Sequence, residues 1–168
     1  MKQLVIYFSH TGENYMSDGI RNIEKGNTEI VAEMIQQLTG ADLFKIEPVS
    51  DYPHHYQECC DLAKEELENN VRPEIKHQIN NIENYDVIYI GGPVWWGRYP
   101  RVIITSIENL DFEGKIVKPF TTHEGSGLGS IMQDITECCV GADIRPGIAI
   151  RGSQVNQAKE IVESWCIK

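Results

Sequence analysis

The sequence has no hydrophobic run long enough to cross a membrane. A transmembrane helix needs roughly 20 consecutive apolar residues, and every apolar stretch here is much shorter. The N-terminal stretch "MKQLVIYFSH" has one lysine and a short apolar run, but no cleavage site of small residues follows it. We therefore expect this stretch to form a first strand rather than a signal peptide, and we predict no association with membranes.

Basic residues are also scarce. The chain has 15 Lys and Arg against 25 Asp and Glu, which gives a formal net charge of -10. Proteins that bind nucleic acids need basic patches to neutralise the phosphates, so this class is excluded. An acidic surface instead favours partners with a basic surface, because long-range attraction steers their encounter.

The five cysteines form no regular pattern. They occur as Cys59-Cys60, Cys138-Cys139 and Cys166, with no CxxC motif and no zinc-type spacing alongside the histidines. An odd number without a framework is typical of reduced thiols in a cytoplasmic protein. We expect no metal site and a cytoplasmic location.

What the sequence does contain is an alternation of apolar strands and amphipathic helices. The hydrophobic fraction of 41% and the length of 168 residues predict one globular domain over residues 1–168. Strand patterns occupy 4–8, 41–48, 85–93, 114–125 and 144–150. Helical spacing occurs over 27–38, 59–67, 101–110, 130–139 and 155–165.

This alternation predicts an α/β domain, a three-layer sandwich with a mostly parallel sheet. In such folds, ligands bind outside the carboxyl ends of the strands, where the strand order reverses. The informative loops are therefore those that follow the apolar strands at Phe8, Ile90 and Phe120.

The first loop is rich in hydroxyl groups and leads to a helix. Ser9 and Thr11 follow the first strand, and Asn27 and Thr28 in "KGNT" stand where the helical pattern begins. A helix N-terminus offers unpaired N–H groups and a partial positive charge, so it can hold a phosphate without a lysine. The alternative is that Asn27 or Thr28 is an ordinary helix cap, with Gly40 ending the same helix.

The second loop, "GGPVWWGRYP", carries two adjacent tryptophans between glycines. Two consecutive indoles on a tight loop do not easily both face the core. We therefore favour a planar aromatic ligand lying against Trp95 or Trp96 over simple core packing.

The third loop, "TTHEGSGLG", has three glycines in five residues. Glycine lets the backbone approach a ligand closely and present its N–H and C=O groups, although a flexible connector has the same composition. A catalytic pair formed by His123 and Glu124 is a weaker hypothesis.

The order of these motifs resembles the flavodoxin-like proteins, especially the short single-domain branch with a Pro-x-Trp-Trp-Gly second loop. The similarity extends along the whole chain through "YFSHTG", "GNTEIVAEMI", "ADLFKIEP", "RPEIK", "YDVIYIGGPVWWGRYP" and "PFTTHEGSGLGS". It implies a five-stranded parallel sheet in the order 2-1-3-4-5, with FMN bound where the order reverses.

The resemblance also implies the residues that would bind FMN. The phosphate loop would comprise Ser9, His10, Thr11, Asn14, Asn27 and Thr28. The isoalloxazine loop would comprise Pro93, Val94, Trp95, Trp96 and Gly97, and the loop at the pyrimidine edge Thr122, His123, Glu124 and Gly125.

The chain departs from many such relatives at residues 13–26, which separate Thr11-Gly12 from Asn27-Thr28. Because both ends of the loop keep their residue types, we predict that the loop survives and that the insert forms a small flap beside it. Asn14 would then join the phosphate shell, and Tyr15 and Met16 would cover the ligand. The alternative is an excursion without contacts.

The function implied is an FMN-binding redox protein, in the first place an electron carrier that docks through the acidic stretch 58–68. The alternative is an NAD(P)H-dependent oxidoreductase that reduces a small quinone-like acceptor. The third loop favours this alternative, because it has no aromatic residue to cover the flavin. The absence of a GxGxxG fingerprint argues against a separate tight NAD(P)H site. A weaker alternative is an interaction protein that has lost the cofactor.

Overall fold

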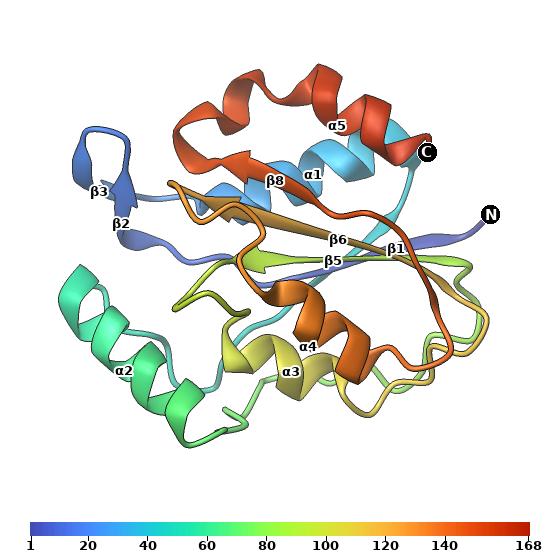
Figure 1. The fold of residues 1–168 in the computed structure, drawn as a ribbon, viewed down its shortest axis with the longest axis horizontal. Coiled ribbons are helices and arrows are strands. Elements are labelled where there is room, and N and C mark those ends of the chain that lie inside the picture. Colours follow the sequence, from blue (N-terminus) through green and yellow to red (C-terminus); the bar gives the residue numbers. More distant parts are fainter.

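A central parallel sheet with helices on both faces organises the fold (Figure 1). The computed structural model describes residues 1–168. The sheet consists of β1 (Gln3–Tyr7), β4 (Asp42–Lys45), β5 (Val87–Pro93), β6 (Ile116–His123), β7 (Asp143–Ile144) and β8 (Ile148–Arg151). Its order is β4-β1-β5-β6-β7, and β8 also pairs with β6, always in parallel. With β7 and β8 taken together as the fifth strand, the predicted order 2-1-3-4-5 is confirmed.

The helices divide between the two faces. They are α1 (Asn27–Thr39), α2 (Tyr56–Glu68), α3 (Arg101–Ile107), α4 (Ile131–Cys138), the 3-10 helix η1 (Gly152–Gln157) and α5 (Lys159–Cys166). In Figure 1, α1 and α5 lie above the sheet, and α3 and α4 lie below it with α2 to their left. None of these helices combines the length and the apolar character needed to cross a membrane.

Each face of the sheet has its own core. Alternate residues of β1 point to opposite faces, so that Val5 packs with α1 and α5 while Leu4 and Ile6 pack with α3 and α4. The two clusters contain 15 and 19 buried residues, respectively. Burial on both faces explains why this strand is a continuous apolar run instead of an alternating one.

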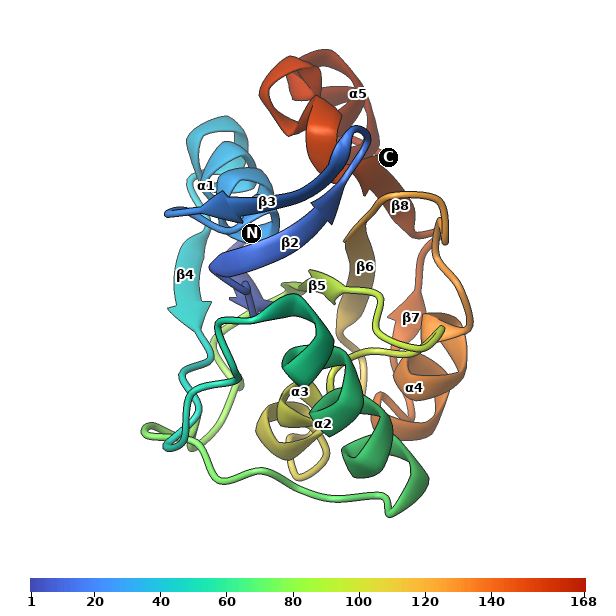
Figure 2. The same cartoon turned by 90° about the vertical axis from the view of Figure 1, so that its left-hand side faces the viewer.

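The insert forms an antiparallel hairpin of β2 (Gly12–Met16) and β3 (Gly19–Ile23), which stands apart from the sheet (Figure 2). It is fastened at its base to the start of α2. The N–H of Glu13 donates to the carbonyl of His54 at 3.0 Å, and the Glu13 carboxylate accepts the N–H of Tyr56 at 2.7 Å. The hairpin is therefore held in place by contacts, and the alternative of an excursion without contacts is wrong.

Three local predictions need correction. The N-cap of α1 is Gly26, not Asn27 or Thr28, and Ser9 supplies the capping oxygen by accepting the N–H of Glu29 at 3.0 Å. Gly91-Gly92-Pro93 has the composition of a turn that would end the strand, but the strand that begins at Val87 continues through these residues to Pro93. The pattern 144–150 forms two short strands, because Pro146 lies between them and lacks an N–H group for the ladder.

The strand reaches Pro93 because its glycines make room for neighbouring side chains. A Cβ at Gly91 would lie 2.0 Å from the ring of Phe120, and one at Gly92 would lie 2.4 Å from Ile103. These glycines serve packing rather than a turn. The predicted C-cap at Gly40 is confirmed, with a left-handed φ of 75°.

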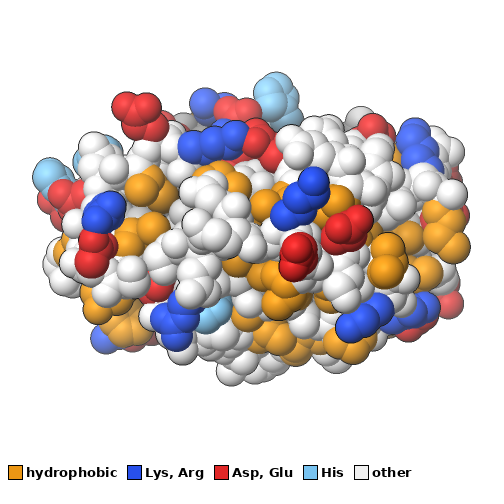
Figure 3. All heavy atoms as spheres, turned by 90° about the horizontal axis from the view of Figure 1, so that it is seen from above, with side chains coloured by type: hydrophobic (Ala, Val, Ile, Leu, Met, Phe, Trp, Pro, Cys, Tyr) orange, Lys and Arg blue, Asp and Glu red, His pale blue; other side chains and the backbone are white.

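The negative charge is not gathered on the upper face of the molecule. Figure 3 shows this face with acidic and basic side chains interspersed among apolar atoms. The acidic helix α2 lies below the sheet in Figure 1, beside the hairpin.

Candidate functional site

A cavity of about 550 Å³ lies at the carboxyl ends of β1, β5 and β6. The loops that follow these three strands contribute to its wall, as the topology predicts. It contains all of the predicted site residues except Ser9, Thr11 and Gly97, namely His10, Asn14, Asn27, Thr28, Pro93, Val94, Trp95, Trp96, Thr122, His123, Glu124 and Gly125. Residues from three distant parts of the sequence are thus brought together in one place.

The N-terminus of α1 forms one end of the cavity. A Cβ at Gly26 would lie 2.0 Å from Ser9 Oγ and 2.9 Å from the carbonyl oxygen of His10, so only glycine allows the first loop to approach this closely. Helix geometry leaves the N–H groups of Asn27 and Thr28 without partners inside the helix. No lysine or arginine lines the cavity. This end can therefore hold an anion through N–H groups and the helix dipole alone.

Thr28 joins the first loop to the third. Its hydroxyl lies 2.7 Å from the hydroxyl of Thr122, and the two residues are 1% and 5% exposed. A hydrogen bond at this depth fixes the start of α1 against the end of β6. The side chain of Thr28 thus helps to fix the shape of the cavity, and its backbone N–H group is available to an anion.

The second loop turns sharply at Trp96 and Gly97, where φ is 55° and 79°. The turn is closed by two hydrogen bonds, from the Trp95 N–H to the Arg98 carbonyl at 2.8 Å and back at 3.1 Å. The two indoles diverge as expected. Trp95 packs edge-on against Tyr52, with ring centroids 4.8 Å apart, whereas Trp96 is 53% exposed and donates its ring N–H to the carbonyl of Cys60 at 2.9 Å. One ring is anchored in the core and the other stands at the mouth of the cavity.

The third loop presents backbone rather than free side chains. The carboxylate of Glu124 accepts the N–H of Ser153 at 2.6 Å and its hydroxyl at 3.2 Å, and His123 Nδ1 accepts the N–H of Gly125 at 2.9 Å. Burial and the nearby Arg151 lower the pKa of His123. Because the carboxylate of Glu124 is already bonded within the loop, the geometry favours a structural role for it over a catalytic pair.

The hairpin and α2 complete the wall. Asn14 donates to the carbonyl of His10 at 3.1 Å, and the rings of Tyr15 and Tyr56 lie 6.2 Å apart across the gap between hairpin and helix. Met16 lies outside the cavity lining, but its sulfur accepts the side-chain N–H of Asn27 at 3.5 Å. The insert therefore lies beside the first loop, as predicted for a flap.

Sequence reasoning missed the contribution of α2. Its residues that line the cavity are Tyr56, Gln57, Cys59, Cys60 and Ala63. The helical spacing of Cys59 and Ala63 marks a buried stripe, but nothing local indicates which neighbour the stripe faces.

Burial lowers the pKa of His10, whose Nε2 lies 3.3 Å from the carbonyl of Pro53 and 3.7 Å from Cys59 Sγ. The cavity thus contains a neutral imidazole beside a thiol.

Comparisons with known proteins agree with this geometry. The flavodoxin family model matches residues 2–167. A proposed flavoprotein from Bacteroides uniformis is 27% identical, with a TM-score of 0.79 over 99% of this chain and 98% of its own. Another from Bacteroides eggerthii is 28% identical, with a TM-score of 0.72 over 96% and 97%.

A more distant structure shares the fold. The flavoprotein from Lactobacillus acidophilus, solved in complex with FMN, is 23% identical, with a TM-score of 0.64 over 93% of this chain and 97% of its own. No curated protein matches the chain.

Proposed function

The chain belongs to the flavodoxin family, and from this premise we propose that it binds FMN and carries electrons between redox proteins. The observation that supports this most strongly is the cavity of about 550 Å³, with an anion-binding helix end and an aromatic wall. Its volume is in the range of about 300–1,000 Å³ that is typical of small-molecule sites.

The anion-binding end suits the phosphate group of FMN. The N–H groups at the start of α1 would hold the phosphate, together with the side chain of Asn27 and the backbone of the first loop. In a chain with a net charge of -10, a site without a cation depends on the helix dipole and on close approach. The close approach is provided by Gly26, which has no Cβ to separate the loop from the helix.

The aromatic wall suits the isoalloxazine ring. Trp95 and Trp96 would lie along one side of the ring, and the backbone of Thr122 to Gly125 would meet its polar edge. Tyr15 and Tyr56 line the same cavity from the hairpin and α2, and would shield the ring from water. Cover of this kind favours a carrier, in which the cofactor stays bound and exchanges only electrons.

Bound FMN would supply transfer of one or two electrons, and the protein would bind, shield and tune it. Helix α2 supports the carrier function, because one side of it lines the cavity while its outer side is acidic. Glu58, Asp61, Glu65 and Glu68 are exposed there, against the single cation of Lys64. A redox partner with a basic surface would therefore be steered to the helix beside the cofactor.

The visible absorption spectrum of the freshly purified protein tests the proposal. The protein is measured as purified, after addition of FMN with removal of the excess, and after the same treatment with riboflavin. We expect a retained flavin band with FMN and much weaker retention of riboflavin, which lacks the phosphate. Protein that stays colourless after FMN would contradict the proposal and favour an interaction protein without cofactor.

An NAD(P)H-dependent oxidoreductase is the second candidate. One observation favours it, since the third loop contributes no tryptophan, tyrosine or phenylalanine to the cavity. Steady consumption of NADPH in the presence of a quinone would support this function. Reduction in two separate one-electron steps, without such turnover, would support the carrier.

A further inference from the structure

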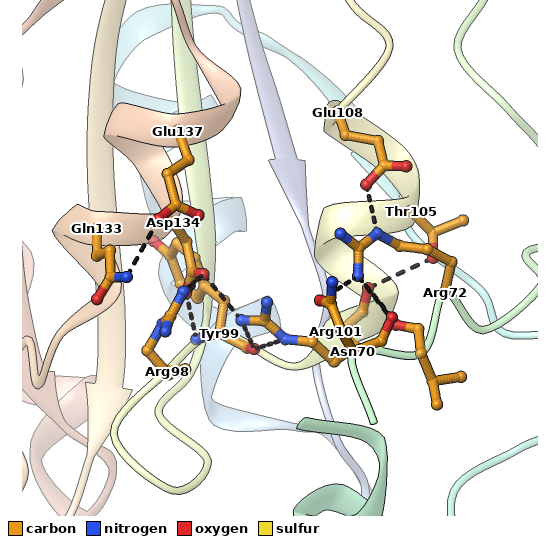
Figure 4. Close-up of polar contacts among 11 residues, drawn as sticks. Asn70, Arg72, Arg98, Tyr99, Arg101, Thr105, Glu108, Gln133, Asp134 and Glu137 are labelled. Atoms are coloured by element: carbon orange, nitrogen blue, oxygen red, sulfur yellow. Dashed lines mark hydrogen bonds and ion pairs between the residues drawn. The ribbon is translucent and has the colours of Figure 1, made fainter. Parts of the chain in front are cut away.

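A second cavity lies on the other side of the Trp95–Arg98 turn, between the end of α2 and helices α3 and α4. Its volume is about 310 Å³, and three arginines line it, Arg72, Arg98 and Arg101 (Figure 4). It shares no lining residue with the first cavity. Three guanidinium groups around one cavity are unexpected in so acidic a chain.

Two of these arginines share a single buried carboxylate. Arg98 Nε lies 3.1 Å and Arg101 Nη2 lies 2.9 Å from the same oxygen, Asp134 Oδ1, whose partner oxygen accepts the N–H of Tyr99 at 3.0 Å. The side chains of Asp134 and Arg101 are only 1% and 5% exposed. Arg98, whose side chain is 21% exposed, gives the cluster of Arg98, Arg101 and Asp134 one positive charge more than it has negative charge. A cation that shares its carboxylate with a second cation favours a further anionic partner.

The guanidinium groups also keep free donors. The hydrogen bonds of Arg98 use Nε and Nη2, and those of Arg101 use the same two nitrogens, which leaves Nη1 of each without a protein partner. Arg72 bonds through Nε and Nη1, which leaves its Nη2. Ser106 Oγ is the one buried side-chain atom without a partner, so Nη1 of Arg98 and of Arg101 is accessible to solvent. Arg72 is an exposed residue.

Two further carboxylates, Glu108 and Glu137, line the rim, and each bonds to a side chain other than Arg98 and Arg101. Glu108 is paired with Arg72, and Glu137 accepts the side-chain N–H of Gln133 at 3.1 Å. The ion pairs of Arg98 and Arg101 involve only Asp134. Both glutamates are exposed, where water and salt screen their charge.

We propose that this cavity binds a small oxyanion, a phosphate group, held by Arg101 and Arg72 with Arg98 beside them. Guanidinium groups recognise phosphate through forked, charge-assisted hydrogen bonds, and the free nitrogens provide the donors. The anion would lie directly behind the second loop, because the backbone of Arg98 closes the turn of Trp95. The site is independent of the cofactor proposed above.

Isothermal titration calorimetry with inorganic phosphate tests the proposal. The ionic strength is kept constant by replacing chloride with phosphate. The variants are Arg72→Gln, which removes a donor, and Glu137→Gln, which removes a competing carboxylate. Both side chains lie at the rim, so neither variant empties the core. Lys76→Gln is the matched control, since it removes an exposed cation paired with Glu47, outside the cavity.

We expect Arg72→Gln to weaken phosphate binding about tenfold, the effect of one charge-assisted hydrogen bond. Glu137→Gln should strengthen it about twofold, and Lys76→Gln should leave it unchanged. Absence of binding, or equal affinity in all four proteins, would overturn the proposal. Equal affinity in all four proteins would also result if phosphate bound at the N-terminus of α1 instead, and FMN would then displace the phosphate.

Discussion

The hydroxyl groups of Thr28 and Thr122 lie 2.7 Å apart and fully inside the protein, although 94 positions separate them in the sequence. This contact ties the helix end that would hold a phosphate to the loop that would meet the flavin ring. Neither residue has another side-chain partner, so the geometry of the cavity depends on the two hydroxyls together.

Replacing either threonine by valine should lower the free energy of unfolding by about 1–2 kcal/mol, because the remaining hydroxyl is buried without a partner. The double variant should cost less than either single variant, since it leaves no unpaired hydroxyl. Urea unfolding of the four proteins measures this. Strictly additive losses would show that the two hydroxyls do not act as a pair.

Gly26→Ala should weaken FMN binding at least about tenfold, which corresponds to about 1.4 kcal/mol. The new Cβ would lie 2.0 Å from Ser9 Oγ and would push the first loop away from the helix end. Fluorescence titration with FMN measures the affinity. Gly40→Ala, at the other end of the same helix, is the control.

Gly40 has a φ of 75° and open space around its Cα, so alanine there should cost about 1 kcal/mol of stability and leave FMN affinity intact. If both variants bound FMN like the wild type, close approach at Gly26 would not matter for the cofactor.

The strands and the loops were predictable because their signals are local. The unbroken apolar run from Leu4 to Phe8 reflects burial on both faces of the sheet. The three glycines of the third loop all adopt a positive φ, which is the backbone freedom that their composition indicates. Hydroxyl content was less informative. Ser9 caps α1 and Thr11 is exposed, although both have the side chains expected of a phosphate loop.

The wall formed by α2 was not predictable, because it depends on contacts between distant residues. Glu13 and Tyr56 are 43 positions apart, and their hydrogen bond places the helix against the hairpin. No periodicity in either segment specifies this pairing. For the same reason, the cluster of Arg98, Arg101 and Asp134 gave no signal in the sequence, since its charges come from different elements.

The attachment of the hairpin to α2 should depend on pH. The N–H of Tyr56, and to a smaller extent His55, lowers the pKa of Glu13 below its usual value. A carboxyl whose pKa is lowered on folding stabilises the attachment at higher pH, and this contribution is lost as the pH falls through the lowered pKa.

Amide hydrogen exchange at Tyr15, followed by NMR, measures this attachment. In the wild type, the protection of the Tyr15 amide is compared with that of an amide far from the hairpin. The ratio of the two should fall as the pH drops through the lowered pKa of Glu13. In Glu13→Gln, which cannot titrate, the same ratio should stay constant. A parallel fall in both proteins would assign the change to another group.

The two tryptophans should differ in what they contribute. Trp95 is packed against Phe8 and Tyr52, so Trp95→Phe should leave a gap in the core and cost about 1–2 kcal/mol of stability. Trp96 is 53% exposed, so Trp96→Phe should change the free energy of unfolding by less than about 0.5 kcal/mol.

For the rate at which FMN is released, we expect the opposite: Trp96→Phe should have a larger effect than Trp95→Phe. The ring N–H of Trp96 donates to the carbonyl of Cys60 and holds the indole at the mouth of the cavity, between the second loop and α2. Phenylalanine lacks this donor, so its ring would swing away and FMN would dissociate several-fold faster, which stopped-flow fluorescence measures. If Trp96→Phe released FMN at the wild-type rate, the exposed indole would serve the surface alone, and Trp95 would be the ring that meets the flavin.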